Sequence, residues 1–276
     1  MPVNARRLIR KMRGGAQAHL IEADDGHAYV VKFKNNPQHR RILVNELISS
    51  VFLNYLRIAV PETAIVSVSQ TFVDANPDLC LQLGDRRIPV EPGWQFGSRF
   101  PGDPSMMAVY DFIPDALLKT VANRRHFLGI LVFDKWIGNA DARQAVFFRA
   151  RLREWLHDAQ GPRRLGFVAL MMDHGYVFDG PHWTFTDSPI QGLYFRPAVY
   201  EDVDSWDDFQ PWLDQVVNFP EEVLDSAFKQ VPREWLDGDE ETLEKLFHTL
   251  LRRRARTPGL IRDCTAGRVN PFPNWK

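Results

Sequence analysis

The sequence predicts a two-lobed α+β fold in which a small β-rich lobe precedes a larger lobe that is mostly helical. Short strand-like runs with hairpin turn signals dominate residues 1–103, whereas longer apolar runs at helical spacing dominate residues 104–276. A Pro-Gly-Asp-Pro sequence at residues 101–104 separates the two patterns, and such breaks are typical of domain boundaries. We therefore expect residues 1–103 and 104–276 to form separate lobes.

The composition is that of an ordinary soluble globular protein. The chain has 276 residues, 45% of them hydrophobic, and a net charge of -1, so no overall field attracts it to nucleic acid or to an anionic membrane. Its 2 cysteines, Cys80 and Cys264, are far apart in sequence, which argues against a zinc site and suits a reducing compartment. The longest apolar run has about a dozen residues, too few to span a bilayer. We therefore expect a cytoplasmic protein without direct nucleic-acid or membrane binding.

A basic segment opens the chain and leads to a glycine pair. No apolar stretch follows residues 1–13, so the segment is not a secretion signal. Gly14 and Gly15 come shortly before a strand-like run at residues 18–22. A glycine pair at the opening of a hairpin lets backbone amides approach a phosphate closely, although a plain surface turn has the same sequence pattern. The pair alone does not decide between these two interpretations.

The rest of the first lobe alternates strands with one helix. The returning strand of the first hairpin, residues 28–34, carries Lys32. Further strand character appears at residues 58–61, 64–68, 79–83 and 94–100. A helix is predicted by apolar residues at helical spacing: Leu43, Leu47, Ile48, Val51, Phe52, Tyr55 and Leu56. Glu46 borders that apolar stripe, either as a surface acid or as an acid that faces Lys32 from a helix packed on the sheet.

The second lobe centres on a buried helix that ends beside an acid. Residues 127–137 are apolar almost all round, within a helix predicted at residues 123–137. Gly138 and Asn139 end this helix, because both residues accept the left-handed backbone found at helix ends. Asp141 is therefore expected on a loop at the end of a rigid helix, where scaffolds often display functional groups.

Two short apolar strands follow this loop, at residues 145–148 and 166–172, and Asp173 lies at the tip of the second. A polar interval, residues 150–164, separates them. Other elements are predicted as a strand at residues 176–178 and helices at residues 106–121, 206–216, 223–228 and 242–254. The arginine run at residues 252–256 fits a solvated helix end. The acidic and aromatic segment 201–214 could either gate a groove or simply pack.

Taken in order, the singled-out groups fit a phosphoryl-transfer site. Such a site needs a phosphate cradle, a cation on the phosphates, a base for the acceptor hydroxyl and ligands for magnesium. The glycine pair, Lys32, Glu46, Asp141 and Asp173 supply these kinds of group in the order found in protein kinases, although the strings VAIK, HRD and DFG are absent. The chain also has no HExxH, no GxSxG and no local Cys/His nucleophile signature.

Several strings add a family resemblance. VVKF and NELISSVFLNYLRIAVPE in the first lobe, followed by WIGNAD and LMMDHG in the second, are similar to the HipA-like kinase family, particularly its short single-chain members. The resemblance continues through VPREW to the terminal FPNW and so covers most of the chain. It implies a bilobal protein-kinase-like fold, with ATP and Mg²⁺ as cofactors.

The resemblance also implies a role for each group. Lys32 would bind the α/β-phosphates of ATP, and Glu46 would orient Lys32. Asp141, the acid of GNAD, would be the catalytic base, and Asp173 would be a magnesium ligand.

The resemblance further implies how the nucleotide is held. Gly14 and Gly15 would belong to the phosphate loop, while the strand that contains Gly97 and Ser98 would lead to the hinge that meets adenine. Ala16 stands where a hydroxyl would be expected in the loop. The chain begins at the phosphate loop, without the extra N-terminal segment of full-length HipA toxins, so we do not extend their DNA-binding antitoxin partner to it.

The second magnesium ligand departs from the family pattern. The family usually has Asn five residues after the catalytic acid, whereas Val146 occupies that position here. The amide oxygen of Gln144, in a loop two residues shorter, or that of Asn139 could replace it. A rival register makes Asp134 the base, with Asn139 at the expected spacing. We reject it because Asp134 lies inside the apolar helix, whereas Asp141 lies beyond its end.

The sequence therefore predicts an ATP- and magnesium-dependent kinase that phosphorylates Ser or Thr on a protein, with Asp141 as the base. Val146 and Ala16 motivate an alternative, a nucleotide-binding pseudokinase that works as an interaction module. A kinase of a lipid or other small molecule is a third interpretation, and it ranks last because no juxtamembrane basic cluster favours lipid.

Overall fold

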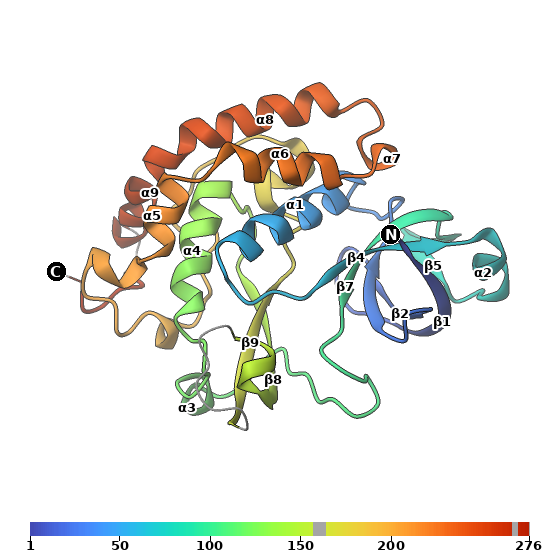
Figure 1. Cartoon of the computed structure of the whole chain (residues 1–276), viewed down its shortest axis with the longest axis horizontal. Coiled ribbons are helices and arrows are strands. Elements are labelled where there is room, and N and C mark those ends of the chain that lie inside the picture. Colours follow the sequence, from blue (N-terminus) through green and yellow to red (C-terminus); the bar gives the residue numbers. More distant parts are fainter. Residues whose placement is uncertain (157–163, 267–269, 276) are drawn as a thin grey trace.

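The computed structural model describes residues 1–156, 164–266 and 270–275, and it separates strands from helices along the chain (Figure 1). A β-barrel built from the first hundred or so residues lies at one end of the molecule, and the helices gather at the other. One hydrophobic core runs from α1 (Arg41–Tyr55) through α4 (His126–Ile137) to α8 (Glu240–Arg253), and a second core fills the barrel. The mixed α+β content agrees with the prediction, while the exact domain limits at residues 103 and 104 stay a prediction.

The barrel is a closed sheet in the order β1-β2-β3-β7-β4. Its strands are β1 (Val3–Lys11), β2 (His19–Ala23), β3 (Ala28–Lys32), β4 (Thr63–Val68) and β7 (Gly93–Arg99). All neighbours are antiparallel except β1 and β4, which run parallel. Tyr29 and Val31 on β3, and Phe33 just after it, are buried in the barrel core.

The basic opening segment is a strand, which the sequence analysis missed. Val3, Ala5 and Leu8 on β1 pack against the barrel core, while its arginines face outward. Only these three side chains and Ile9 are apolar in the strand, and the bulges in its pairing with β2 break the simple alternation. As a result, Gly14 and Gly15 lie in the connection between two paired strands.

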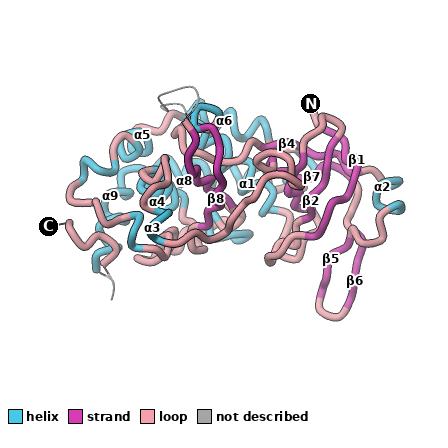
Figure 2. Tube along the Cα trace, turned by 90° about the horizontal axis from the view of Figure 1, so that it is seen from below, coloured by secondary structure: helices cyan, strands magenta, loops and turns pink. Residues whose placement is uncertain are grey.

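Two further elements complete the part of the chain before residue 100. The strand predicted at residues 79–83 is present as β5 (Cys80–Leu83), which forms a hairpin with β6 (Arg86–Pro89) that projects from the barrel (Figure 2). A short helix, α2 (Gln70–Ala75), was not predicted; its N-cap, Ser69, accepts a hydrogen bond from the Phe72 amide. Residues 58–61, predicted as a strand, are instead an irregular link between α1 and β4.

The helical part is built around α4, and all its residues from Phe127 to Ile137 are buried, as predicted. It ends at Gly138, whose φ of 68° is the expected left-handed conformation. The two predicted strands form the antiparallel pair β8 (Gln144–Arg151) and β9 (Leu165–Met172). The other helices are α3 (Asp115–Leu118), α5 (Trp212–Val217), α6 (Glu221–Gln230), α7 (Arg233–Leu236) and α9 (Thr257–Asp263).

Three elements predicted after residue 103 were wrong, each for a local reason. Residues 106–121 contain only the short helix α3, because Pro114 lacks an amide hydrogen and Tyr110 forms a bridge with Phe147 instead. The strand expected at residues 176–178 lies in a 3₁₀ segment, Val177–His182, in which Phe178 has a positive φ. The helix expected at residues 206–216 is split at Pro211 into Trp206–Phe209 and α5.

The arginine run at the end of α8 is only partly a solvated helix end, because Arg252 is exposed whereas Arg253 is buried. The Arg253 side chain is 4% exposed and donates to the backbone carbonyls of Lys135 and Trp136 at the end of α4. It also forms an ion pair with Asp187 at 2.6 Å. Arg253 therefore satisfies carbonyls that the end of a helix leaves without partners.

The segment 201–214 packs rather than standing free. Trp206 and Phe209 contact the rings of Phe272 and Trp275 near the chain's end. Glu201 forms ion pairs with residues of the helical part. The middle of the polar interval predicted at residues 150–164 lies outside the described residues. Among the described helices, none is long and apolar enough to cross a membrane.

Candidate active site

Three groups from three separate elements meet at the interface between the barrel and the helices. Lys32 ends β3, Glu46 lies on α1, and Asp173 follows β9. The Lys32 ammonium donates to Glu46 Oε1 and, at 2.8 Å, to Asp173 Oδ1. The backbone amide of His174 also donates to Glu46 Oε1, at 3.1 Å. The sequence left open whether Glu46 faces Lys32, and the structure shows that it does.

Burial and charge oppose each other in this cluster. The Lys32 and Glu46 side chains are only 12% and 5% exposed. Burial disfavours the charged ammonium, but the carboxylates of Glu46 and Asp173 outweigh it and raise the pKa of Lys32 above its ordinary value. Burial raises the pKa of Glu46, and the ammonium of Lys32 opposes that rise. Lys32 is therefore held as a cation aimed at the Asp173 carboxylate.

Asp173 has an unusual backbone that turns its side chain toward Lys32. Its φ is 59°, in the left-handed region where Asp is one of the few tolerated non-glycine residues. The carboxylate remains 38% exposed, and the ammonium of Lys32 lowers the pKa of Asp173. An ionised, partly exposed carboxylate with one oxygen committed to Lys32 still has an oxygen available to a ligand.

The loop after α4 holds Asp141 at the surface through Asn139. The Asn139 side chain is fully buried; its amide donates to Asp134 Oδ1 and its oxygen accepts from the Asp141 amide, both at 3.1 Å. The Asp141 carboxylate itself is exposed and accepts from the Ala142 amide at 2.7 Å. The loop is thus fixed from below, while the carboxylate of Asp141 faces outward.

A pocket of about 360 Å³ lies against Asp141. Tyr176, Asp179 and His182 line it from the segment after Asp173, and Gln38 lines it from the other side. Gln38 also lies against the glycine connection, because a Cβ atom on Gly15 would come within 2.6 Å of Gln38 Nε2. Gln38 therefore connects the surroundings of the glycine pair to those of Asp141. The sequence analysis singled out none of these four pocket residues, since their meeting depends on tertiary contacts.

Asp134 and Arg143 form a buried ion pair beneath the loop. Both side chains are 0% exposed, and Arg143 makes two hydrogen bonds to the Asp134 carboxylate, at 2.5 and 2.8 Å. Arg143 also donates to the Met172 carbonyl at 2.8 Å, just before Asp173. Asp134 is thus fully engaged in the interior, in agreement with the rejection of the register that made it the base. The sequence analysis missed Arg143. The signal that could have found it is Asp134, because a charged residue inside an apolar helix needs a partner of opposite charge.

Comparison with known proteins places this arrangement in a family. A model of the HipA-like kinase family matches residues 6–256. The chain belongs to the HipA-like kinase family. This membership confirms the resemblance seen in the sequence and supports a phosphotransferase function.

Solved structures of kinases are similar to this HipA-like kinase in fold. The Helicobacter pylori proinflammatory kinase CtkA matches 96% of this chain and 99% of its own, with 13% identity and a TM-score of 0.50. The Golgi casein kinase with Mn/ADP bound matches 97% of this chain and 73% of its own, with 13% identity and a TM-score of 0.46. The similarity to CtkA shows a kinase-like fold. No curated protein sequence matches the chain.

The candidate metal ligands of this HipA-like kinase differ in whether their side chains are already engaged in hydrogen bonds. Asn139 has both halves of its amide in internal hydrogen bonds, which argues against it as a ligand. Gln144 is exposed, and the β8–β9 register places it opposite Met172, the residue before Asp173. The described residues contain no cluster of three or more His, Cys, Asp or Glu that could hold a metal by itself. The donor set of Asp173 and Gln144 fits Mg²⁺, which commonly takes few protein ligands together with phosphate oxygens.

Gly97 and Ser98 lie on strand β7 of the barrel. Strand β7 is paired with β3 on one side and β4 on the other, and a Cβ atom on Gly97 would come within 2.6 Å of a Val66 methyl group. Gly97 is therefore a close-packing residue of the barrel. Met107 and Val109, just after β7, instead pack against apolar clusters of both the barrel and the β8–β9 pair. The nucleotide contacts of Gly97 and Ser98 stay a prediction.

Proposed function

We propose that this HipA-like kinase transfers the γ-phosphate of ATP, with Mg²⁺, to a Ser or Thr hydroxyl of a protein. The observation that carries the proposal is the contact of Lys32 with both Glu46 and Asp173, made by three elements that are distant in sequence. An ion-paired lysine aimed at an exposed carboxylate is what a site for the phosphates of a nucleotide and their metal needs. Family membership supports the same class of reaction.

Each residue would act mainly by position and charge. Lys32 would contact the α/β-phosphates, and Glu46 would hold the ammonium in place. Asp173 and Gln144 would hold Mg²⁺, which when bound neutralises charge on the phosphates. The exposed Asp141 carboxylate, beside its pocket, would orient the acceptor hydroxyl and take its proton. Asn139 would keep Asp141 in place through the hydrogen bond to its backbone amide.

The glycine connection would approach the phosphates with its backbone. Gly14 has a φ of 120°, which L side chains rarely adopt, and a Cβ atom on it would meet nothing within 4 Å. The requirement for glycine there is therefore conformational. Gly15 has a weaker requirement for glycine, because the nearby Gln38 Nε2 is the far end of a flexible side chain that can move aside.

A nucleotide-binding pseudokinase is the second candidate, and Val146 favours it. The Val146 side chain is 8% exposed and belongs to an apolar cluster with Phe148 and Leu170. It therefore offers no oxygen at the position where the family usually has Asn. In this alternative Lys32 and Asp173 would bind nucleotide, but no transfer would follow.

Phosphate transfer from labelled ATP separates the two candidates. The purified protein is incubated with Mg²⁺ and protein, lipid or small-molecule acceptors, beside Asp141→Asn, Asp173→Ala and the exposed control Asp225→Asn. Incorporation of label into protein that is lost in the two site variants and kept in the control supports the protein kinase. Magnesium-dependent ATP binding without transfer to any acceptor supports the pseudokinase, and absence of ATP binding refutes both.

The role of Gln144 has its own measurement. Gln144→Ala is expected to raise the Mg²⁺ concentration needed for half-maximal transfer by about tenfold, because one oxygen ligand is lost. Gln230→Ala, an exposed glutamine on α6, should leave this concentration unchanged. An unaltered magnesium requirement in Gln144→Ala refutes the assignment.

A further inference from the structure

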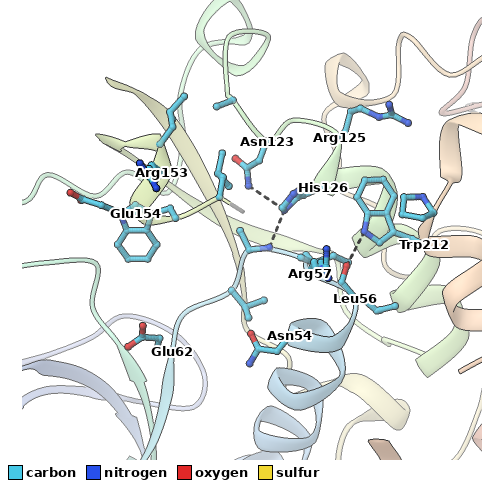
Figure 3. Close-up of a pocket in the computed structure, with 18 of the residues that line it drawn as sticks. Asn54, Leu56, Arg57, Glu62, Asn123, Arg125, His126, Arg153, Glu154 and Trp212 are labelled. Carbon is cyan, nitrogen blue, oxygen red and sulfur yellow. Dashed lines mark hydrogen bonds between the residues drawn. The ribbon is translucent and has the colours of Figure 1, made fainter. Parts of the chain in front are cut away.

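A second, much larger pocket lies away from the proposed active site. Its volume is about 1440 Å³, and it opens between the link from α1 to β4, the start of α4, the end of β8 and the turn before α5 (Figure 3). None of its lining residues belongs to the smaller pocket or to the cluster around Lys32. Along α1, Leu56 in this pocket follows Glu46 by ten residues, or about 15 Å of helix.

The charges that line this pocket are mostly positive. Its basic residues are Arg57, Arg99, Arg125, Arg153 and Arg164, and its acidic residues are Glu62 and Glu154. Arg99 is paired with Glu62. The side chains of Arg57 and Arg153 are exposed, and neither has a hydrogen-bonding or ionic partner among the residues that the structure describes. Unpaired guanidinium groups around a concave surface favour an anionic ligand.

The size and walls of the pocket indicate what kind of anion it takes. Pockets for small molecules usually measure roughly 300–1,000 Å³, so this one suits an extended chain. Partly exposed apolar side chains also line the pocket, among them Val60, Trp155 and Leu156.

The two indoles of the pocket argue against a nucleic acid. Trp212 is 7% exposed, and its Nε1–H donates to the Leu56 carbonyl at 3.2 Å. Trp155 packs edge-to-face against Phe148, with ring centroids 4.8 Å apart. Both rings are thus engaged by the protein itself, whereas single-stranded nucleic acids bind on aromatic faces that are free to stack with bases.

We propose that this pocket binds an acidic peptide segment of another protein, with the peptide's carboxylates on Arg57 and Arg153 and its apolar side chains between them. The inference goes beyond the kinase function and does not depend on it. The floor of the pocket is firmly built, because the Ala59 amide donates to His126 Nδ1 at 2.9 Å (Figure 3). The Ala59 carbonyl accepts from the Met171 amide, two residues before Asp173. A peptide bound here therefore rests on the link that is hydrogen-bonded to β9.

Fluorescence anisotropy with a labelled peptide of alternating Glu and Leu tests the proposal without any kinase assay. The full chain is compared with Arg57→Glu/Arg153→Glu and with a control of equal charge change, Arg86→Glu/Arg149→Glu. All four arginines are exposed, and the two control residues lie outside the pocket lining. The pocket variant is expected to bind at least about tenfold more weakly, whereas the control variant keeps the affinity of the unaltered protein. Added salt should weaken binding, because it screens exposed charges.

Several results would overturn the proposal. A matched Lys/Leu peptide that binds equally well shows that charge is not recognised. Equal loss of affinity in the control variant shows that only the overall charge matters. Displacement of the peptide by inorganic phosphate at equal concentration shows a site for small anions rather than for a peptide, and absence of saturable binding removes the site altogether. None of these outcomes bears on whether the protein is a kinase.

Discussion

Arg143 lies directly beneath the Asp141 loop and joins it to the strand that leads to Asp173. Its guanidinium bonds to the Asp134 carboxylate in α4 and to the Met172 carbonyl at the end of β9. The two sides of the proposed active site are thus held to one buried ion pair. Because this pair has no contact with solvent, its partners depend on each other strongly.

Removal of Arg143 should therefore destabilise the fold severely. Arg143→Met leaves the Asp134 carboxylate buried without its partner, and we expect a loss of about 3–5 kcal/mol in the free energy of unfolding, measured with urea. The double variant Asp134→Leu/Arg143→Met removes the stranded charge and should be more stable than Arg143→Met alone. Strictly additive effects of the two substitutions would contradict the buried pair.

The contact between Lys32 and Glu46 predicts a loss of activity without a loss of fold. Glu46→Gln keeps the size of the side chain but removes the charge that fixes the ammonium, so phosphate transfer should fall on the order of a hundredfold. Glu91→Gln is a suitable control, because the Glu91 side chain is 59% exposed and its Oε2 lies 3.9 Å from Nζ of Lys34, a lysine just beyond β3. Transfer rates that fall equally in both variants would show that the buried contact has no special role.

A buried histidine predicts how stability depends on pH. His19 on β2 is 0% exposed, and burial lowers its pKa from the ordinary value, with Lys11 adding to the effect. The folded state therefore binds fewer protons than the unfolded state, so stability should be fully present above about pH 6.5 and decline as the pH falls below it. One such group contributes at most about 1.4 kcal/mol per pH unit.

The variant His19→Leu isolates this contribution. Urea unfolding at several pH values should show a smaller decline in stability below about pH 6.5 than in the unaltered protein. His248→Gln, at an exposed position on α8, serves as the control and should keep the original decline. An identical pH profile in His19→Leu would mean that the burial of His19 does not govern acid stability.

The parts of the fold that could be predicted are those with a strong local signal. The apolar run of α4 and its stop at Gly138 appear directly in the sequence, as do the paired strands β8 and β9. The strand β1 could not be recognised, because four apolar side chains without regular alternation among basic residues give a weak pattern. The helix prediction was also wrong at residues 106–114, because Tyr110 pairs there with Phe147, which is distant in sequence.

The candidate site shows the same division between local and distant information. The order of Lys32, Glu46, Asp141 and Asp173 indicated a phosphoryl-transfer site, and the structure brings three of them into direct contact. Their catalytic roles stay predictions. Gln38 could not have been found from the sequence, because its place beside both Gly15 and Asp141 arises only when the barrel meets the helices.

Arg253 and Arg252 are adjacent in sequence but should differ sharply in their effect on stability. Arg253 is buried and donates to two carbonyls at the end of α4 and to Asp187, whereas Arg252 is exposed. Arg253→Met leaves those carbonyls and a carboxylate without their partner, so it should lower the free energy of unfolding by about 2–3 kcal/mol. Arg252→Met should change it by less than about 0.5 kcal/mol, as expected for an exposed residue. Urea denaturation of the two variants measures the contrast, and equal midpoints would mean that Arg253 does not hold α8 to the end of α4.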